Sequence, residues 1–124
     1  MPNPQDIFQL AQQTATQVTA SPENWRRFLY TAAHNYHTTY LNQLLIHAQR
    51  PDATACAEFD IWRNRMNRYV RRGSKGIALL DESSGFPRLH YVFDVSDTGV
   101  RRNSRDPDLW QYKEYSYLSI CRKK

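Results

Sequence analysis

Residues 67–80, with the sequence NRYVRRGSKGIALL, mark the point at which the helical pattern of the chain gives way to strands. Two short runs, 69–71 and 77–80, flank Gly73-Ser74-Lys75-Gly76, and this arrangement predicts a β-hairpin. A phosphate-binding loop is the other interpretation, but the GxxxxGK[ST] pattern and the helix that follows it are absent. We therefore expect a tight turn with its glycines at positive φ, from which Lys75 contacts a single phosphate.

The segments before this stretch carry helical signals. Ser21 is a good N-cap and Pro22 fits the first helical position, so a helix is predicted over 22–34. A second helix is predicted over 39–49, because Arg50-Pro51 disfavours helical geometry at its end.

Two further segments show apolar residues at helical spacing. Within 1–20 this spacing predicts a short amphipathic helix, and a loosely docked arm is the alternative. A third helix is predicted over 55–66, with Phe59, Trp62 and Met66 on its inner face. Burial in the core is the favoured interpretation of Trp62, ahead of base stacking.

The segment after the predicted hairpin alternates in polarity over 88–95, which predicts a half-buried strand. N-terminal helices packed on a small antiparallel sheet make the expected fold class α+β. We expect three parts: a helix or arm over 1–20, a main domain over 21–98, and a polar, aromatic-containing tail over 99–124.

Composition bounds the class of protein. The 124 residues suffice for one hydrophobic core, and 17 Lys and Arg against 12 Asp and Glu give a formal net charge of +5. This charge favours an anionic partner, and nucleic acid is favoured ahead of acidic lipid. We expect no membrane partner. Cys56 and Cys121 form no ligand spacing, which indicates reduced thiols in a cytoplasmic protein.

The densest charge lies between Ile61 and Leu80, where six cations occur without an acid. Trp62 and Tyr69 stand among them, and cations beside aromatic rings are typical of single-stranded nucleic-acid binding. Tyr69 is the better stacking platform if Val70 points inward. A solvated charged face is the alternative interpretation. The six cations are Arg63, Arg65, Arg68, Arg71, Arg72 and Lys75.

Asn42 and Gln49 form a polar pair at the edge of an apolar helix face, seven residues apart. They either cap a neighbouring loop or face the ligand groove and bond to bases or phosphates.

Signals for catalysis are weak. The four histidines have no HExxH arrangement, and the acids Asp52, Glu58 and Asp60 lack the lysine element of metal-dependent nucleases. We expect a protein that is not an enzyme, with no metal site and no cofactor.

The order of several motifs resembles the N-terminal domain of ArdC-like antirestriction proteins. It is similar above all to the version of that domain in large helicase or methylase proteins of conjugative elements. The resemblance covers about 21–98. The motifs are Trp25-x-x-Phe28-Leu29, Tyr36…Asn42, Gln49-Arg50-Pro51, Trp62, Arg68-x-Val70-Arg71-Arg72-Gly73-x-Lys75-Gly76 and Val92-Phe93-Asp94-Val95-Ser96-Asp97-Thr98.

That resemblance implies binding of single-stranded DNA without catalysis. It implies that the matching positions matter, namely Asn42, Gln49, Arg68, Arg71, Arg72 and Lys75. Two departures stand out: Asn67 replaces a usual glycine, although Asn tolerates left-handed geometry, and no metalloprotease segment is present.

Two hypotheses follow. The first is a non-catalytic single-stranded-DNA-binding module of a mobile element, with a basic helix and hairpin on the phosphates and little sequence specificity. RNA is a variant ligand, because charge and stacking hardly distinguish it. The second is a protein-interaction domain whose basic hairpin docks an acidic partner or further domains of a larger protein.

Overall fold

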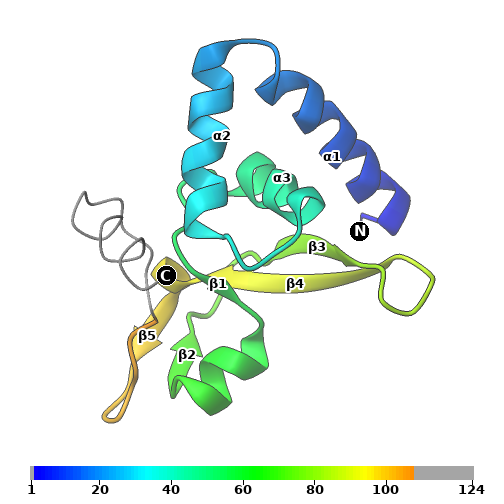
Figure 1. Ribbon diagram of the computed structural model, residues 1–124. Helices are drawn as coiled ribbons and strands as arrows, with labels where there is room; N and C mark the ends of the chain where they lie inside the picture. The colour runs from blue at the N-terminus through cyan, green and yellow to red at the C-terminus, as the bar shows by residue number, and fades with distance from the viewer. Residues whose placement is uncertain (1, 108–124) are drawn as a thin grey trace, which may run out of the picture.

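A computed structural model describes residues 2–107 of the chain (Figure 1). The fold is α+β, with three α-helices followed by short strands and helical turns. In chain order the elements are α1 (Pro4–Val18), α2 (Pro22–His34), α3 (Tyr40–Gln49), β1 (Cys56–Ala57), the π-helical turn η1 (Ile61–Arg65), β2 (Arg68–Val70), β3 (Ile77–Asp81), β4 (Arg88–Asp94), the 3-10 turn η2 (Val95–Asp97) and β5 (Thr98–Val100).

The first three helices begin at side chains that cap them. Asn3 and Asp6 form a reciprocal capping box at α1, and the Ser21 hydroxyl accepts from the Asn24 backbone N–H at α2. Thr39 caps α3 in the same way, accepting from the Asn42 N–H at 3.3 Å. The helices predicted over 22–34 and 39–49 are therefore confirmed.

The N-terminal segment is a docked helix and not a loose arm. Ile7 and Ala11 of α1 are buried in one core cluster together with Leu45 of α3 and Leu79 of β3. Val18, at the end of α1, belongs to a second cluster with residues of α2 and α3. The segment therefore shares its core with the main domain.

The helix predicted over 55–66 is wrong in its first half. Cys56 and Ala57 form β1, which pairs with Asp94 and Phe93 of β4, so this part of the chain is extended. Helical structure begins only at Phe59, whose side chain is 45% exposed and does not line the core as expected. Trp62 is buried as expected, and its indole N–H donates to the Phe93 carbonyl at 2.9 Å.

The predicted hairpin between 69–71 and 77–80 is also wrong. β3 pairs with β4 in a three-stranded antiparallel sheet of order β1-β4-β3, whereas β2 pairs with β5 in a separate two-stranded ribbon. The segment 71–76 is therefore a link between two sheets. β5 also crosses the predicted boundary at 98/99, so the main body extends beyond Thr98.

The buried carboxylate of Asp94 fixes the end of β4, the strand predicted over 88–95. Its buried positions are Val92 and Asp94, whereas Tyr91 is 41% exposed. Asp94 is 3% exposed, and its Oδ1 accepts from the backbone N–H groups of Thr54 and Ala55 at 2.9 and 3.1 Å. Its Oδ2 accepts from the Ser96 N–H at 3.1 Å. These bonds join the segment after α3 to the turn that leads into β5.

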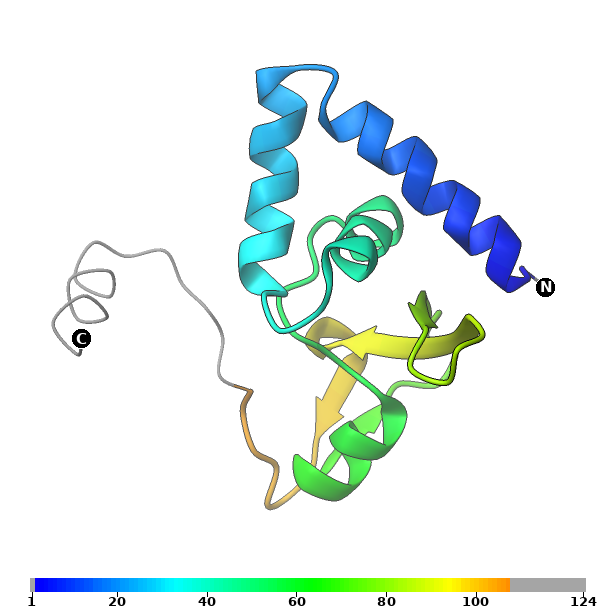
Figure 2. The same cartoon turned by 45° about the vertical axis from the view of Figure 1, so that its right-hand side comes forward.

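The elements form two halves on either side of the β3–β4 hairpin. In both views α1, α2 and α3 lie on one side of it, and η1, β2 and β5 lie on the other (Figures 1 and 2). The half that contains η1 and β2 carries the stretch of uninterrupted positive charge.

Candidate nucleic-acid interface

Exposed cations gather in the half of the molecule built from η1, β2 and β5, and we call this set the basic surface. They come from η1, from the link between β2 and β3, and from the turn after β5. Among residues 2–107 no carboxylate pairs with any of them, so their charge is open to an external anion. The set comprises Arg63, Arg65, Arg71, Arg72, Lys75, Arg101 and Arg102.

Tyr69 lies at the centre of the β2–β5 ribbon, opposite Gly99. A Cβ atom at Gly99 would lie 2.1 Å from the Tyr69 Cζ, so the ring occupies the space that any other residue would fill. The ring is 43% exposed, and the guanidinium carbon of Arg101 lies 5.7 Å from its centroid. The ribbon thus displays an aromatic surface beside a cation. Because Val70 is half-buried, this agrees with the expected orientation of Tyr69.

Strand alternation aligns cations with this ring. Arg71 extends the ladder beyond β2, because its N–H donates to the Asp97 carbonyl at 2.8 Å. Side chains two residues apart share a face of a strand, so Arg71 lies on the Tyr69 side of β2, and Arg101 lies on the Gly99 side of β5. The exposed face of the ribbon therefore carries a ring between two arginines.

The link between the sheets is anchored at both ends. The Ser74 N–H donates to the Arg71 carbonyl at 3.1 Å. Gly73 has the expected positive φ, at 84°, whereas the same expectation for Gly76 is wrong. At Gly76 an added Cβ would lie 3.1 Å from the Tyr91 Cβ, so the chain runs close against β4. Between these anchors Lys75 is exposed to solvent.

Arg68 belongs to the interior and not to the basic surface. Its side chain is 9% exposed, with Nε donating to the Arg105 carbonyl at 2.8 Å and Nη1 to the Thr98 hydroxyl at 3.1 Å. Nη2 lies 2.6 Å from Oδ1 of Asp106. These contacts hold the segment after β5 against β2. The predicted phosphate contact by Arg68 is therefore wrong, and Arg68 is not part of the candidate site.

Asn42 and Gln49 likewise point into the fold. The amide of Asn42 donates to the Leu80 carbonyl and accepts from the Leu80 N–H, both at 3.0 Å. Gln49 makes the same pair of bonds to Ala78, both at 2.9 Å. The partner is strand β3, neither a loop nor a ligand groove, so neither amide is available to DNA as predicted.

Arg101 and Arg102 are functional candidates that the sequence pattern missed. They follow β5, in a segment expected to be a polar tail, and only the pairing of β5 with β2 brings Arg101 beside Tyr69. Their signal in the sequence is a further Arg-Arg pair, the third in the chain, after the short run 98–100. The polar, turn-rich sequence over 99–107 predicts a tail and hides this strand.

Asn67, in the turn before β2, adopts the left-handed geometry that was expected where it replaces a glycine. Asn67 has a φ of 51°, which confirms that asparagine supports the turn here. Its carbonyl accepts from the Ser104 hydroxyl at 2.6 Å. The turn after β5 is thereby tied to the start of β2.

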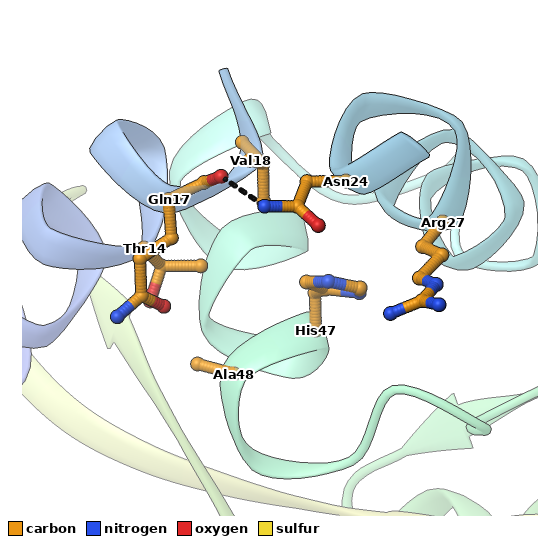
Figure 3. A pocket seen from close by; sticks show the side chains of 7 residues that line it. All are labelled: Thr14, Gln17, Val18, Asn24, Arg27, His47 and Ala48. Carbon is orange, nitrogen blue, oxygen red and sulfur yellow. Dashed lines mark hydrogen bonds between the residues drawn. The ribbon is translucent and has the colours of Figure 1, made fainter. Parts of the chain in front are cut away.

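A separate cavity of about 320 Å³ lies among α1, α2 and α3, on the far side of the molecule from the basic surface. Figure 3 shows Arg27 of α2 and His47 of α3 pointing toward one another across it. Burial lowers the pKa of His47, so the ring is neutral at pH 7.

The hydrogen bonds of Thr31 fix the tautomer of this neutral ring. Its hydroxyl lies 2.9 Å from the Pro51 carbonyl and 2.8 Å from Nδ1 of His47. Since a carbonyl only accepts, the single hydroxyl proton goes to Pro51, and the His47 Nδ1–H donates to Thr31. The remaining ring nitrogen, Nε2, is then an acceptor.

The Cys56 thiol is not activated for nucleophilic attack. Burial raises the pKa of the Cys56 thiol to about 12, so it is protonated and a poor nucleophile at pH 7. In the range 2–107 no cluster of three or more His, Cys, Asp or Glu is arranged to hold a metal ion. None of the helices in that same range is long and apolar enough to cross a membrane.

Comparison with family models, with curated proteins and with solved structures gives no match to this chain. The basis for a function is therefore the geometry of the basic surface, together with the order of motifs in the sequence.

Proposed function

We propose that this protein is a non-catalytic single-stranded-DNA-binding module that contacts phosphates through the basic surface. One observation carries the proposal: unpaired cations flank Tyr69, an exposed ring set over Gly99. Cations that follow a phosphate backbone, beside rings on which bases stack, suit a single strand. The resemblance to ArdC-like N-terminal domains supports the same ligand, and we propose an antirestriction or conjugative-element protein of the cytoplasm as the source of the module.

The ligand is a single strand because stacking on Tyr69 requires an unstacked base, which a duplex does not offer. Sequence preference is expected to be slight, since arginines that contact phosphate carry no information about the base. RNA contacts the same charge and ring, so its affinity is the first comparison to make.

The geometry changes the expected set of contacts. The expected contacts no longer include Arg68, Asn42 and Gln49, and they now include Arg101 and Arg102. If all seven members of the basic surface contact phosphate, log K against log salt falls with a slope of roughly −5, at about 0.7 per contact. A slope near zero contradicts the proposal.

The test is fluorescence anisotropy of a labelled single strand of about 20 nucleotides at several salt concentrations, beside the matching duplex and RNA. Arg71→Ala/Arg72→Ala is expected to lower affinity about tenfold or more and to reduce the slope by roughly one to two. Arg26→Ala/Arg27→Ala is the matched control, because these arginines are also exposed but lie on α2 and pair with Glu23. The control is expected to keep wild-type affinity.

The alternative function is docking of an acidic protein on the basic surface, because the same unpaired cations serve a carboxylate-rich partner. This alternative predicts that Arg71→Ala/Arg72→Ala and the control bind a single strand with equal affinity. That result, with wild-type binding insensitive to salt, assigns the basic surface to a protein partner.

A further inference from the structure

A groove crosses the β1–β4–β3 sheet beside the basic surface. η1 forms one wall, and the turn between α2 and α3 forms the other. Its central part has a volume of about 630 Å³. The floor is apolar and is made by Ile46, Ala57, Leu79 and Val92.

The groove continues past its central part in both directions. Toward η1 it joins a cavity of about 200 Å³ through His37, Cys56, Ala57 and Ile61, which line both. Toward the β3–β4 turn it meets a cavity of about 660 Å³ through the shared residues Glu58 and His90, but the acids Asp81 and Glu82 also line that cavity. The central part and the part toward η1 are therefore the ones suited to a DNA strand.

The two walls differ in chemistry. Arg65 lines the η1 wall and is also a member of the basic surface, so the groove opens where the positive charge lies. On the opposite wall lies His37, whose ring is tilted by 42° against that of Tyr36 with ring centroids 4.1 Å apart. A cation therefore faces the His37 ring across an apolar floor.

We infer that this groove receives bases of the strand whose phosphates lie on the basic surface, and the inference rests on the proposed function. Glu58 in the groove repels phosphate but accepts from the exocyclic amines of bases. Its carboxylate lies 3.7 Å from Nδ1 of His90, so acceptor and donor groups stand together beside the apolar floor. Phosphates thus remain at the Arg65 rim while bases point inward.

The groove and Tyr69 are separate base sites, and this separation makes the inference testable. We compare an oligodeoxycytidine of about 20 nucleotides, whose bases carry exocyclic amines, with an abasic strand of the same phosphate count, so that charge is constant and only bases differ. Wild-type protein is expected to bind the base-containing strand about tenfold or more tightly. Two variants alter the groove: Ala57→Leu fills its floor and His37→Ala removes a ring from its wall.

Ala57→Leu is expected to reduce the preference for bases to about threefold or less with the salt slope unchanged, because the phosphate contacts remain. His37→Ala changes an exposed residue outside any helix or strand and is expected to reduce the preference less. If Ala57→Leu lowers the thermal midpoint, His37→Ala still tests the groove. Tyr69→Ala is the reference for loss of the other base site.

The outcomes separate the inference from the proposed function. Loss of the base preference in both groove variants supports the inference. Wild-type preference in folded Ala57→Leu and His37→Ala overturns it and leaves single-strand binding intact. Failure of wild-type protein to bind either strand overturns the proposed function, and the inference with it. Displacement of DNA by a neutral apolar peptide, blocked by Ala57→Leu, assigns the groove to a peptide and overturns the inference.

Discussion

Arg50 reaches from the end of α3 to Asp97, with Nη1 2.8 Å from Oδ2 of the carboxylate. The Asp97 carbonyl in turn accepts from the N–H of Arg71, so one residue connects the helical half to the basic surface. The same guanidinium donates to the Ser96 hydroxyl at 2.7 Å. The hydrogen bond to Asp97 raises the pKa of Arg50, so the charge of this connection is permanent.

Replacing Arg50 with methionine is expected to lower the free energy of unfolding by about 1–2 kcal/mol, because a charged hydrogen bond is lost from side chains that keep partial contact with water. Urea unfolding measures the loss. Arg27→Met is the control, since its pairing with Glu23 involves side chains 70% and 59% exposed. An equal effect of the two substitutions contradicts a specific role for Arg50.

Replacing Asn42 with leucine is expected to lower the free energy of unfolding by about 2–4 kcal/mol, because the buried N–H and carbonyl of Leu80 both lose their partner. Gln12→Leu on the exposed side of α1 is the control. While the variant is folded, its affinity for a single strand is expected to equal that of wild type. Weaker binding by folded Asn42→Leu returns this residue to the set of DNA contacts.

Replacing Gly99 with alanine is expected to displace the Tyr69 ring, since the new methyl group needs the space that the ring occupies. The end of a tyrosine side chain moves easily, so the thermal midpoint changes little. Affinity for a single strand is expected to fall as in Tyr69→Ala, corresponding to about 1–3 kcal/mol for one stacked base. Tyr30→Ala on α2, 59% exposed, controls for loss of an exposed ring. Wild-type affinity of Gly99→Ala shows that ring position is irrelevant.

The burial of His47 makes stability depend on pH. Its pKa in the folded protein lies below the ordinary value of 6.5, so the unfolded chain takes up the proton first as pH falls. The stability from the neutral ring is complete above pH 6.5 and is lost as pH falls from there through the folded pKa. Urea midpoints at pH 7.5 and 5.5 are expected to differ less in His47→Gln than in wild type, because the variant lacks the loss of stability that protonation of His47 causes. Equal differences in both proteins contradict this role.

Local signals predicted the helices. The cap at Ser21, which starts α2, and the stop at Arg50-Pro51, which ends α3, act within a few residues and could be recognised in the sequence. Strand pairing depends instead on distant segments. β2 and β5 have three residues each, too few for periodicity to show which strand pairs with which.

The same distinction between local and distant signals explains which residues of the candidate site could be predicted. Arg71, Arg72 and Lys75 could be predicted as exposed cations because the run contains no acid. The burial of Arg68 could not, since it depends on Asp106 and Arg105 folding back across β2. Arg101 shows the converse: only the pairing of β5 brings it to Tyr69.

The bonds from Asn42 and Gln49 to β3 also affect how the protein behaves among copies of itself. An unpaired outer strand offers its N–H and carbonyl groups to any extended chain it meets, and this is a common route to fibrils. Here the outward groups of Ala78 and Leu80 are already occupied by two side-chain amides from α3. A helix thus takes the position of a further strand, and the most apolar segment of the sheet, Ile77–Leu80, is closed to self-association.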